Sequence, residues 1–484
     1  MSIRKMLTGF AGNGSFAVRS KMLPMPRSRH MVAGNSGAMR RPCEIMLHPE
    51  IESLDRDAIK ALQAQKLTAL GDRLAASPDW CEHFAGAGMQ PRDLAAADGL
   101  AGAPTMEKSD LRARYPFPML TVDTTRVARF FATSGTTGLP VMFGFTDNDL
   151  HRLLAVQVAR QLYCIGVRPG DRTYQGYGYG LWIGGPAHDL GLEELGATCF
   201  PVGPGRSELV VQWLRDQAWE VATASPLFLA HLVRVAGDNG IDPKKDWKLR
   251  IAVIGGQGVS RAFREHLEAE MPAGFRAFGS YGTTESGGPN IGISCPFSHD
   301  RDEMHLISED TVITEILDPD TLEPVAPGEV GEIVVTTLDK EASPVVRWRT
   351  RDLVQLSEKP YDCECGRHGM PTIGRIIGRS DDMLKVRGVI VYPSQIEDVI
   401  AGTPGTVKEA WQIYVDTVDG SPHSMSVAIE CEAGYNGDPP DLADIVARSL
   451  SSRLGLKVPV ECHRQGTLPR YEAKAKRVLL KEQS

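Results

Sequence analysis

Long apolar runs and a dense set of cysteines are both missing from the sequence, and each absence excludes a class of protein. No apolar run approaches the length of about 18 residues that a membrane-spanning helix needs, so no membrane partner is predicted. The nine cysteines are scattered apart from Cys363 and Cys365, which argues against a disulfide framework. Free cysteines fit a reducing cytosol, and we therefore predict a cytoplasmic protein.

Acidic residues are missing from the first 43 positions, which contain eight Lys and Arg residues. The remaining chain holds 45 basic and 61 acidic residues, and such an acidic body is a poor match for a nucleic-acid backbone, so no nucleic-acid partner is predicted. Residues 1–45 are expected to be a disordered extension or a transit peptide. The alternative is that the start is mis-assigned and translation begins at Met46. The 484 residues, 42% of them hydrophobic, suffice for two or three globular domains.

Strand and helix signals alternate after Met46, which predicts α/β layers. Thr146 and Asp149 form a capping-box pattern that predicts a helix to about Cys164. The other early elements expected are a helix over Asp55–Ala76, buried strands over Val127–Ala132 and Leu249–Ile254, and a helix from Ser260.

Short strands replace this alternation after Thr311 and predict a small, antiparallel, β-barrel-like subdomain. They are expected over Val312–Leu317, Glu332–Thr337 and Val345–Arg349. A smaller unit should follow, with a helix over Ser394–Ile400, strands over Trp411–Val415 and Ser426–Glu430, and a helix near Leu442–Leu454. The predicted α/β fold thus has a large N-terminal domain of layered subdomains at 46–381 and a small mobile α+β domain at 382–484.

A loop rich in hydroxyl groups and glycine follows the strand predicted to end at Ala132. It consists of Thr133, Ser134, Gly135, Thr136, Thr137 and Gly138. Glycine permits positive φ, so successive backbone N–H groups can converge on an anion, and the hydroxyls add donors for phosphate oxygens. The loop is not a Walker loop, because no Gly-Lys-Ser/Thr follows. Its composition indicates a phosphate-binding loop, although an ordinary turn has a similar composition.

A second candidate segment, Tyr281-Gly282-Thr283-Thr284-Glu285, stands at the end of a strand predicted over Phe275–Ser280. Its aromatic ring can stack on a base, and its carboxylate can hold Mg²⁺ against phosphate. A third segment, Arg349-Thr350-Arg351-Asp352, offers a carboxylate that can accept hydrogen bonds from ribose hydroxyls. A surface turn and a surface ion pair are the plainer interpretations of these two segments.

Two further polar segments lie in the C-terminal part of the chain. The first, residues 378–388, contains Arg379 and Asp381 and lies where the two predicted domains meet. The second, residues 468–477, contains Lys474 in a basic tail, which by itself is typical of a solvated surface.

Together and in this order, the five segments resemble the core motifs of the adenylate-forming superfamily of acyl-CoA synthetases, adenylation domains and luciferases. The likeness is closest to phenylacetate–CoA ligases and runs from about Met46 to Val478. Supporting segments are His48–Glu52, Lys108–Arg112, Tyr177–Gly185, Leu317–Pro319, Met383–Gly388 and Val391–Pro393.

The resemblance implies an enzyme with two half-reactions. The carboxylate of an acid attacks the α-phosphate of ATP and expels pyrophosphate, and the thiol of coenzyme A then attacks the acyl carbonyl and AMP leaves. The implied partners are a small aromatic carboxylic acid, ATP, Mg²⁺ and coenzyme A. The sequence does not decide whether the chain forms a homodimer. The alternatives are an adenylating enzyme that passes the acyl group to an amine or a carrier protein, and a catalytically weak nucleotide-binding relative.

The resemblance also assigns roles to individual residues. Thr133–Gly138 would hold the β,γ-phosphates, while Gly256, Gln257 and Tyr281 would frame the adenine. Thr284 and Glu285 would serve phosphate and Mg²⁺, with Gly282 and Thr283 in the same segment, and Asp352 and Arg379 would bind the ribose. Lys474 would contact the negative charge that develops during adenylation, and Asp381 would be the hinge. Tyr177, Tyr179 and Trp182 would line the acyl pocket.

Three positions depart from the family pattern. Leu139 stands where the phosphate loop usually has Lys, Ala473 replaces the Gly before the catalytic Lys, and Gly255-Gly256-Gln257 replaces Gly-Ala-Glu. The first change removes a charge-assisted contact worth about 1.5–3 kcal/mol when fully formed.

The segment Cys363-Glu364-Cys365-Gly366 is typical of half a zinc knuckle. Cys295 with either His299 or His305 can supply the other half, giving three thiols and one imidazole around a tetrahedral structural Zn²⁺. Free buried cysteines are the alternative. Related ligases carry a similar pattern, and the resemblance favours His305.

Overall fold

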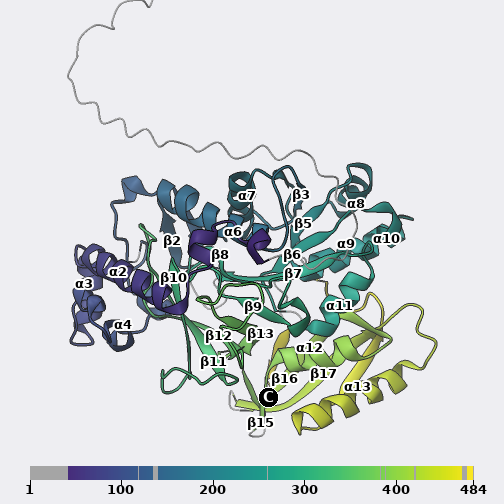
Figure 1. Cartoon of the computed structure of the whole chain (residues 1–484). Coiled ribbons are helices and arrows are strands. Elements are labelled where there is room, and N and C mark those ends of the chain that lie inside the picture. Colours follow the sequence, from purple (N-terminus) through teal and green to yellow (C-terminus); the bar gives the residue numbers. More distant parts are fainter. Residues whose placement is uncertain are drawn as a thin grey trace, which may run out of the picture. The chain divides into compact units, whose positions relative to one another are not determined.

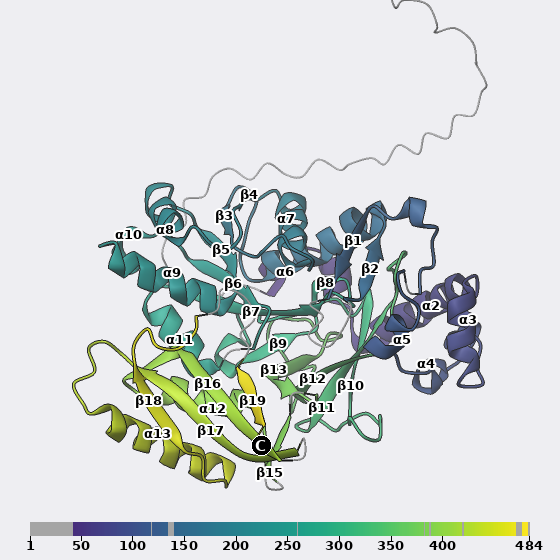
Figure 2. The same ribbon diagram turned by 180° about the vertical axis from the view of Figure 1, so that it is seen from behind.

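The computed structural model describes residues 42–117, 119–133, 140–258, 260–381, 383–386, 389–418, 421–470 and 477–482. Figures 1 and 2 show them from opposite sides. Residues 41–484 belong to one compact unit, so the predicted boundary between residues 381 and 382 stays a prediction. None of the helices within these ranges is both long enough and apolar enough to cross a membrane.

Short helices open the described chain. The helix predicted over Asp55–Ala76 is present as α2 (Arg56–Leu74), and the Asp55 carboxylate caps it by accepting a hydrogen bond from the Ala58 backbone N–H at 2.8 Å. Ile59 and Leu70 are fully buried, so one face of α2 packs on the core. The other helices of this part of the sequence are α1 (Pro49–Glu52), α3 (Pro78–Ala85), α4 (Gly99–Gly102) and α5 (Lys108–Arg112).

A hairpin and a long helix follow. The strand predicted over Val127–Ala132 begins two residues late, as β1 (Arg129–Ala132), and pairs antiparallel with β2 (Met142–Phe145). The predicted capping box is present, because the Thr146 N–H donates to Asp149 at 2.9 Å and the Asp149 N–H donates to the Thr146 hydroxyl at 3.0 Å. The helix is π-helical over Asp149–Leu154 and α-helical as α6 (Ala155–Cys164).

A single sheet of 11 strands runs through the molecule in the order β10-β11-β12-β13-β9-β8-β7-β6-β5-β3-β4. The strand predicted over Leu249–Ile254 is present but begins two residues late, at Ile251. Every residue of β6 is buried, which is typical of a parallel strand covered on both faces. The parallel strands are β3 (Arg172–Gln175), β4 (Thr198–Pro201), β5 (Val221–Ala224), β6 (Ile251–Gly255) and β7 (Arg276–Thr283).

Helices cover both faces of these parallel strands, which confirms the layered α/β prediction. On β6, Ile251 and Val253 join the apolar cluster of α6 and α7, whereas Ala252 and Ile254 join that of α8, α9 and α11. The alternation follows from the period of two along a strand. The covering helices are α7 (Gly184–Leu195), α8 (Ser207–Asp216), α9 (Pro226–Asp238), α10 (Pro243–Asp246) and α11 (Arg261–Ala269), the last capped by Ser260 as predicted.

The antiparallel strands predicted after Thr311 are present, but as one end of the same open sheet rather than as a separate barrel. The pairing of Ile293 with His305 joins them to the parallel strands, and β10 and β4 are the two edges. The third predicted strand begins at Trp348 instead of Val345. The antiparallel strands at this end of the sheet are β10 (Val312–Leu317), β11 (Val330–Thr337), β12 (Trp348–Leu356) and β13 (Thr372–Arg379), together with β8 (Gly288–Ile293) and β9 (Glu303–His305), which precede Thr311 and were not predicted.

The last part of the chain contains a four-stranded sheet in the order β18-β17-β16-β19 with its own apolar cluster. Asp398 of α12 contacts both Arg375 of β13 at 2.6 Å and Arg453 of α13 at 2.7 Å. The elements are β14 (Leu384–Val386), β15 (Val389–Val391), α12 (Pro393–Gly402), β16 (Thr406–Val418), β17 (Ser421–Cys431), α13 (Pro439–Leu454), β18 (Val460–Arg464) and β19 (Val478–Glu482), which include all four elements predicted there.

Candidate active site

Three of the predicted nucleotide-binding side chains meet where β7, β12 and β13 lie close together. Asp352 on β12 and Arg379 at the end of β13 are register partners. The Tyr281 hydroxyl, from β7, donates to one carboxylate oxygen of Asp352 at 2.7 Å, and an Arg379 guanidinium nitrogen donates to the other at 3.1 Å. Arg379 also makes two hydrogen bonds to Asp381, at 2.8 and 2.9 Å. Strand pairing brings Asp352 and Arg379 together, and hydrogen bonds add Tyr281 from β7 and Asp381 after β13, so the cluster spans 100 positions of the sequence.

The charges of this cluster follow from its burial and its pairing. Burial raises the pKa of Tyr281 well above its ordinary value, and the neighbouring Asp352 carboxylate adds to the rise. The phenol is therefore a donor at neutral pH. Burial acts to raise the pKa of Asp381 as well, but the hydrogen bonds from Arg379 outweigh it, and the pKa of Asp381 lies below its ordinary value. The cluster thus presents one phenol, one guanidinium and two carboxylates.

The predicted adenine loop lies at the carboxyl end of β6, next to β7. A Cβ on Gly255 would stand 2.6 Å from the Ser280 carbonyl oxygen, so the close approach of the two strands requires glycine. Gly256 has a φ of +83°, which also favours glycine, and Gln257 follows it. The carboxyl ends of adjacent parallel strands are where open α/β sheets bind ligands.

The turn after β7 carries Thr284 and Glu285, both buried. It is closed by Ser286, whose hydroxyl donates to the Thr283 carbonyl at 2.9 Å and to Asn290 at 3.0 Å. The Lys108 ammonium lies 3.8 Å from a carboxylate oxygen of Glu285. The turn therefore holds a carboxylate close to a cation, in the position where the sequence predicts phosphate and Mg²⁺.

Sequence reasoning missed Lys340, which lies beneath this turn. Its ammonium is fully buried, donates to the Glu285 carbonyl at 3.3 Å, and stands 4.3 Å from the ring centroid of Phe145 and 5.1 Å from that of Phe143. Burial lowers the pKa of Lys340 to about 8, against the opposing effect of nearby carboxylates. A lysine in a loop between two strands carries no signal of burial in its own sequence.

The three predicted acyl-pocket residues lie in the loop between β3 and α7. Tyr177 is buried and its ring packs edge-on to Trp182 at 5.8 Å, with the hydroxyl donating to the Val253 carbonyl at 3.3 Å. Trp182 is partly exposed, and its ring ends 3.7 Å from where a Cβ on Gly256 would be. Tyr179 is exposed and donates to Asp189 at 2.8 Å. Tyr177 and Trp182 thus adjoin the predicted adenine loop, whereas the hydroxyl of Tyr179 is engaged by Asp189 and by the side chain of Gln175.

Two predicted segments fall largely outside the described residues. Thr133 is buried and its N–H donates to the Val141 carbonyl at 3.1 Å, but the rest of the predicted phosphate loop, Ser134–Gly138, lies outside them, as does Leu139. Lys474 and Ala473 also lie outside the described residues.

Comparison with known proteins identifies the family. Residues 56–338 match the family described as AMP-binding enzyme, and residues 388–481 match the one described as AMP-binding enzyme C-terminal domain. The chain is also 34% identical to the phenylacetate-coenzyme A ligase of Pseudomonas putida over 432 residues, covering 88% of this chain and 94% of that one. The chain belongs to the AMP-binding enzyme family.

A further relative agrees with this assignment, and a solved structure shares the fold. The phenylacetate-coenzyme A ligase of Escherichia coli K12 is 34% identical to this AMP-binding enzyme, covering 88% of this chain and 96% of that one. A crystal structure of 2-hydroxyisobutyryl-CoA ligase in its postadenylation state shares the fold, with a TM-score of 0.82 at 24% identity, covering 90% of this chain and 92% of that one.

This AMP-binding enzyme also has a buried cluster of sulfur and nitrogen atoms. The ligand atoms of Cys295, His305, Cys363 and Cys365 all lie within 4.8 Å of one another. The Cys295 and Cys363 sulfurs are 3.8 Å apart, and the Cys365 sulfur is 3.1 Å from Nε2 of His305. Nδ1 of His305 lies 3.2 Å from the Met370 carbonyl oxygen, which holds the ring in place.

The structure separates the two histidines that the sequence left open. His305 lies in the cluster, whereas Nε2 of His299 lies 3.0 Å from Glu268 and also contacts Arg264. His299 is therefore engaged elsewhere. Their spacing alone could not separate them, because both follow Cys295 closely, but the family resemblance favours His305, the histidine that lies in the cluster.

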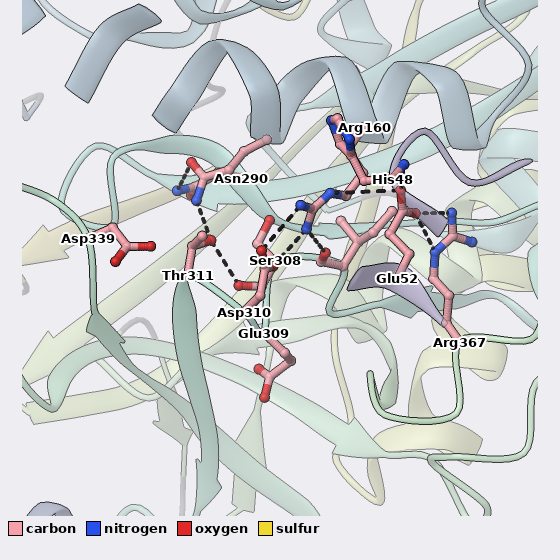
Figure 3. Close-up of polar contacts among 12 residues, drawn as sticks. His48, Glu52, Arg160, Asn290, Ser308, Glu309, Asp310, Thr311, Asp339 and Arg367 are labelled. Carbon is pink, nitrogen blue, oxygen red and sulfur yellow. Dashed lines mark hydrogen bonds and ion pairs between the residues drawn. The ribbon is translucent and has the colours of Figure 1, made fainter. Parts of the chain in front are cut away.

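A chain of buried ion pairs beside this cluster left no trace in the sequence (Figure 3). Glu52 at the end of α1 accepts from Arg367 at 2.6 Å and lies 3.8 Å from Arg160 of α6. Arg160 in turn donates to Asp310 at 2.7 Å. These pairs join α1 to the loop that contains Cys363 and to the start of β10, so α1 is part of the folded core.

Proposed function

We propose that this AMP-binding enzyme activates a small aromatic carboxylic acid with ATP and transfers the acyl group to coenzyme A. The observation that carries the proposal is the cluster of Tyr281, Asp352 and Arg379, next to the loop of Gly256 and Gln257. It combines an aromatic ring with carboxylate acceptors near the carboxyl ends of the parallel strands, where open α/β folds bind nucleotides. The phenylacetate-coenzyme A ligases at 34% identity support the choice of acid and acceptor.

In the first half-reaction, the residues mainly position the reactants. The adenine would lie against Tyr281 and the loop at Gly256, and the ribose hydroxyls would donate to Asp352. Glu285 would hold Mg²⁺, which neutralises charge on the phosphates when bound, and its carboxylate is the kind of oxygen ligand that Mg²⁺ prefers. Lys474 would meet the charge that develops as the acid carboxylate attacks the α-phosphate.

In the second half-reaction, the segment after Asp381 would turn so that coenzyme A replaces Lys474 at the acyl-adenylate. The thiol would attack the acyl carbonyl, AMP would leave, and the thiol proton would pass to solvent. We include in this proposal a domain division into 46–381 and 382–484, with 1–45 as an extension, and a cytoplasmic location. The homodimer remains a prediction.

The Cys295, His305, Cys363 and Cys365 cluster fits Zn²⁺. A tetrahedral zinc with Zn–S bonds of about 2.3 Å places its sulfurs about 3.8 Å apart, and the Cys295 and Cys363 sulfurs stand 3.8 Å apart. Three thiolates and one imidazole fill four positions, so the ion would have a structural role and no open site for catalysis. All four side chains are buried, which keeps the site closed to solvent.

The proposal is tested by ATP–pyrophosphate exchange with a panel of aromatic and aliphatic acids, followed by AMP release with and without coenzyme A. We expect exchange with compact aromatic acids and thiol-dependent release of AMP. Exchange without thiol-dependent release would assign the acyl group to an amine or a carrier protein, and no exchange with any acid would overturn the proposal.

A further inference from the structure

The Lys340 ammonium lies between the turn that carries Glu285 and strand β2, which follows the predicted phosphate loop in the sequence. On one side it donates to the Glu285 carbonyl at 3.3 Å. On the other side it packs on Phe145 and Phe143 of β2, the strand that directly follows the predicted phosphate loop. The side chain therefore bridges the Glu285 turn and the hairpin that carries that loop.

The loop that carries Lys340, between β11 and β12, is itself held firmly. The Asp149 carboxylate accepts hydrogen bonds from the backbone N–H groups of Glu341 at 2.6 Å and Ala342 at 3.0 Å. The Ser343 hydroxyl accepts one from the Gly144 N–H of β2 at 2.8 Å. The backbone of this loop is thus hydrogen-bonded to Asp149, at the start of the helix that follows β2, and its Ser343 side chain to Gly144 of β2. Lys340 therefore has little freedom to move away from the turn.

The charge of Lys340 is not balanced by direct ion pairing. Among the described residues, no carboxylate lies within 4.0 Å of its ammonium, and its hydrogen bond to the Glu285 carbonyl uses only one of three protons. Burying a cation without a paired anion is unfavourable, and contacts with two aromatic rings offset only part of the cost. An anion bound at the neighbouring site would recover more.

We propose that Lys340 is a positioning residue for the polyphosphate of ATP, which rests on the proposed function. It holds the Glu285 turn against the β1–β2 hairpin and supplies a positive electrostatic potential to the proposed polyphosphate site. The sequence has Leu139 where the family's phosphate loop has a lysine, so one cation is missing there. Lys340 adds a fixed positive charge next to the Glu285 turn, acting through position and field rather than through contact with the reacting atoms.

The test compares the affinities for MgATP and AMP by calorimetry in the full-length protein. AMP lacks the β- and γ-phosphates, so K340M should weaken MgATP binding about tenfold or more while AMP binding changes less than about twofold. K340R, which keeps the charge, should retain most of the preference for ATP. Where K340M does not fold, K340Q serves, because it keeps a donor for the Glu285 carbonyl and removes only the charge.

Lys408 provides the matched control. It is also buried, and its ammonium donates to the Thr403 carbonyl and the Thr406 hydroxyl in the C-terminal part of the chain. K408M should lower the melting temperature without changing the ratio of ATP to AMP affinity. An unchanged ratio in both K340M and K340Q would overturn the inference, and so would an equal loss of ATP and AMP. Because binding is measured without turnover, a failure to form thioester would bear on the proposed function alone.

Discussion

Trp182 connects the loop after β3 with the loop at Gly256, because its ring ends 3.7 Å from a Cβ position on that glycine. If this ring limits the acyl pocket, W182F should open space, so longer aryl acids should gain while kcat/KM for the best compact acid falls several-fold. Exchange kinetics over a series of aryl acids of increasing length measure the ranking. W213F changes a tryptophan of α8, packed on Phe200, and should leave the ranking intact. An unchanged ranking in W182F would place the acyl pocket elsewhere.

Lys474 should act in only one half-reaction, because its charge is needed where negative charge develops on the acid and the α-phosphate. K474A should reduce pyrophosphate exchange by at least 100-fold, yet convert supplied acyl-adenylate to thioester at a rate close to that of the wild type. Substitution of the exposed Lys457 should affect neither step. Equal losses in both half-reactions would contradict this role.

At the scale of single elements, β17 holds the segment that leads to Lys474. Glu430 of β17 is buried and accepts hydrogen bonds from Arg470 at 2.6 and 3.0 Å and from the Gly466 N–H at 2.9 Å. Burial acts to raise the pKa of Glu430, but these hydrogen bonds outweigh it and hold the pKa below its ordinary value of 4.5. The resulting stability is fully present above pH 4.5 and is lost as the pH falls through the native pKa.

E430Q should therefore lower the free energy of unfolding by about 3 kcal/mol at neutral pH, because it leaves Arg470 without its buried partner. The difference from the wild type should shrink as the pH falls below about 4.5. Urea unfolding at several pH values measures it. E461Q on the neighbouring β18 changes an exposed carboxylate and serves as the control. A difference that does not depend on pH would show that lost packing, not charge, explains the effect.

The metal cluster links three elements: β9, the turn after β8, and the loop before β13. Purified protein that has not met a chelator should contain one zinc per chain by elemental analysis. C365S should lower the metal content and the melting temperature together, since binding at a closed site contributes to folding. C81S removes an exposed cysteine and should keep the metal. Less than about a tenth of a zinc per chain in the wild type would count against the site.

At the scale of the whole molecule, the proposed reaction requires the part after Asp381 to turn between half-reactions. In this structure, Asp381 is held by two hydrogen bonds from Arg379, and the Ser380 N–H donates to the Arg351 carbonyl at 2.7 Å. D381P fixes φ and removes an N–H, so it should trap one arrangement and slow one half-reaction far more than the other. D381A removes the same carboxylate but leaves the backbone free. Pre-steady-state rates that are alike in D381P and D381A would place the hinge elsewhere.

Much of the local structure could be predicted because it depends on neighbouring residues. The caps at Asp55, at Thr146 with Asp149 and at Ser260 each rest on hydrogen bonds between residues three positions apart, so their spacing is visible in the sequence. The family's motifs were also visible, because each is a short run of consecutive residues and the runs follow one another in a fixed order. They pointed to Tyr281 and Asp352 before their contact was known.

Contacts between distant parts of the chain depended on the tertiary structure. The sequence alone determined the alternation of strands and helices, the order of the motifs and the cysteine pair at Cys363 and Cys365. Only the folded chain decided that His305 rather than His299 joins that pair, that Glu52 meets Arg367, and that Lys340 lies under Glu285. These partners are separated by 55 to 315 positions, and each pairing is set by how strands and loops pack. A hydrogen bond within one turn leaves a fixed spacing in the sequence, whereas one made by packing leaves none.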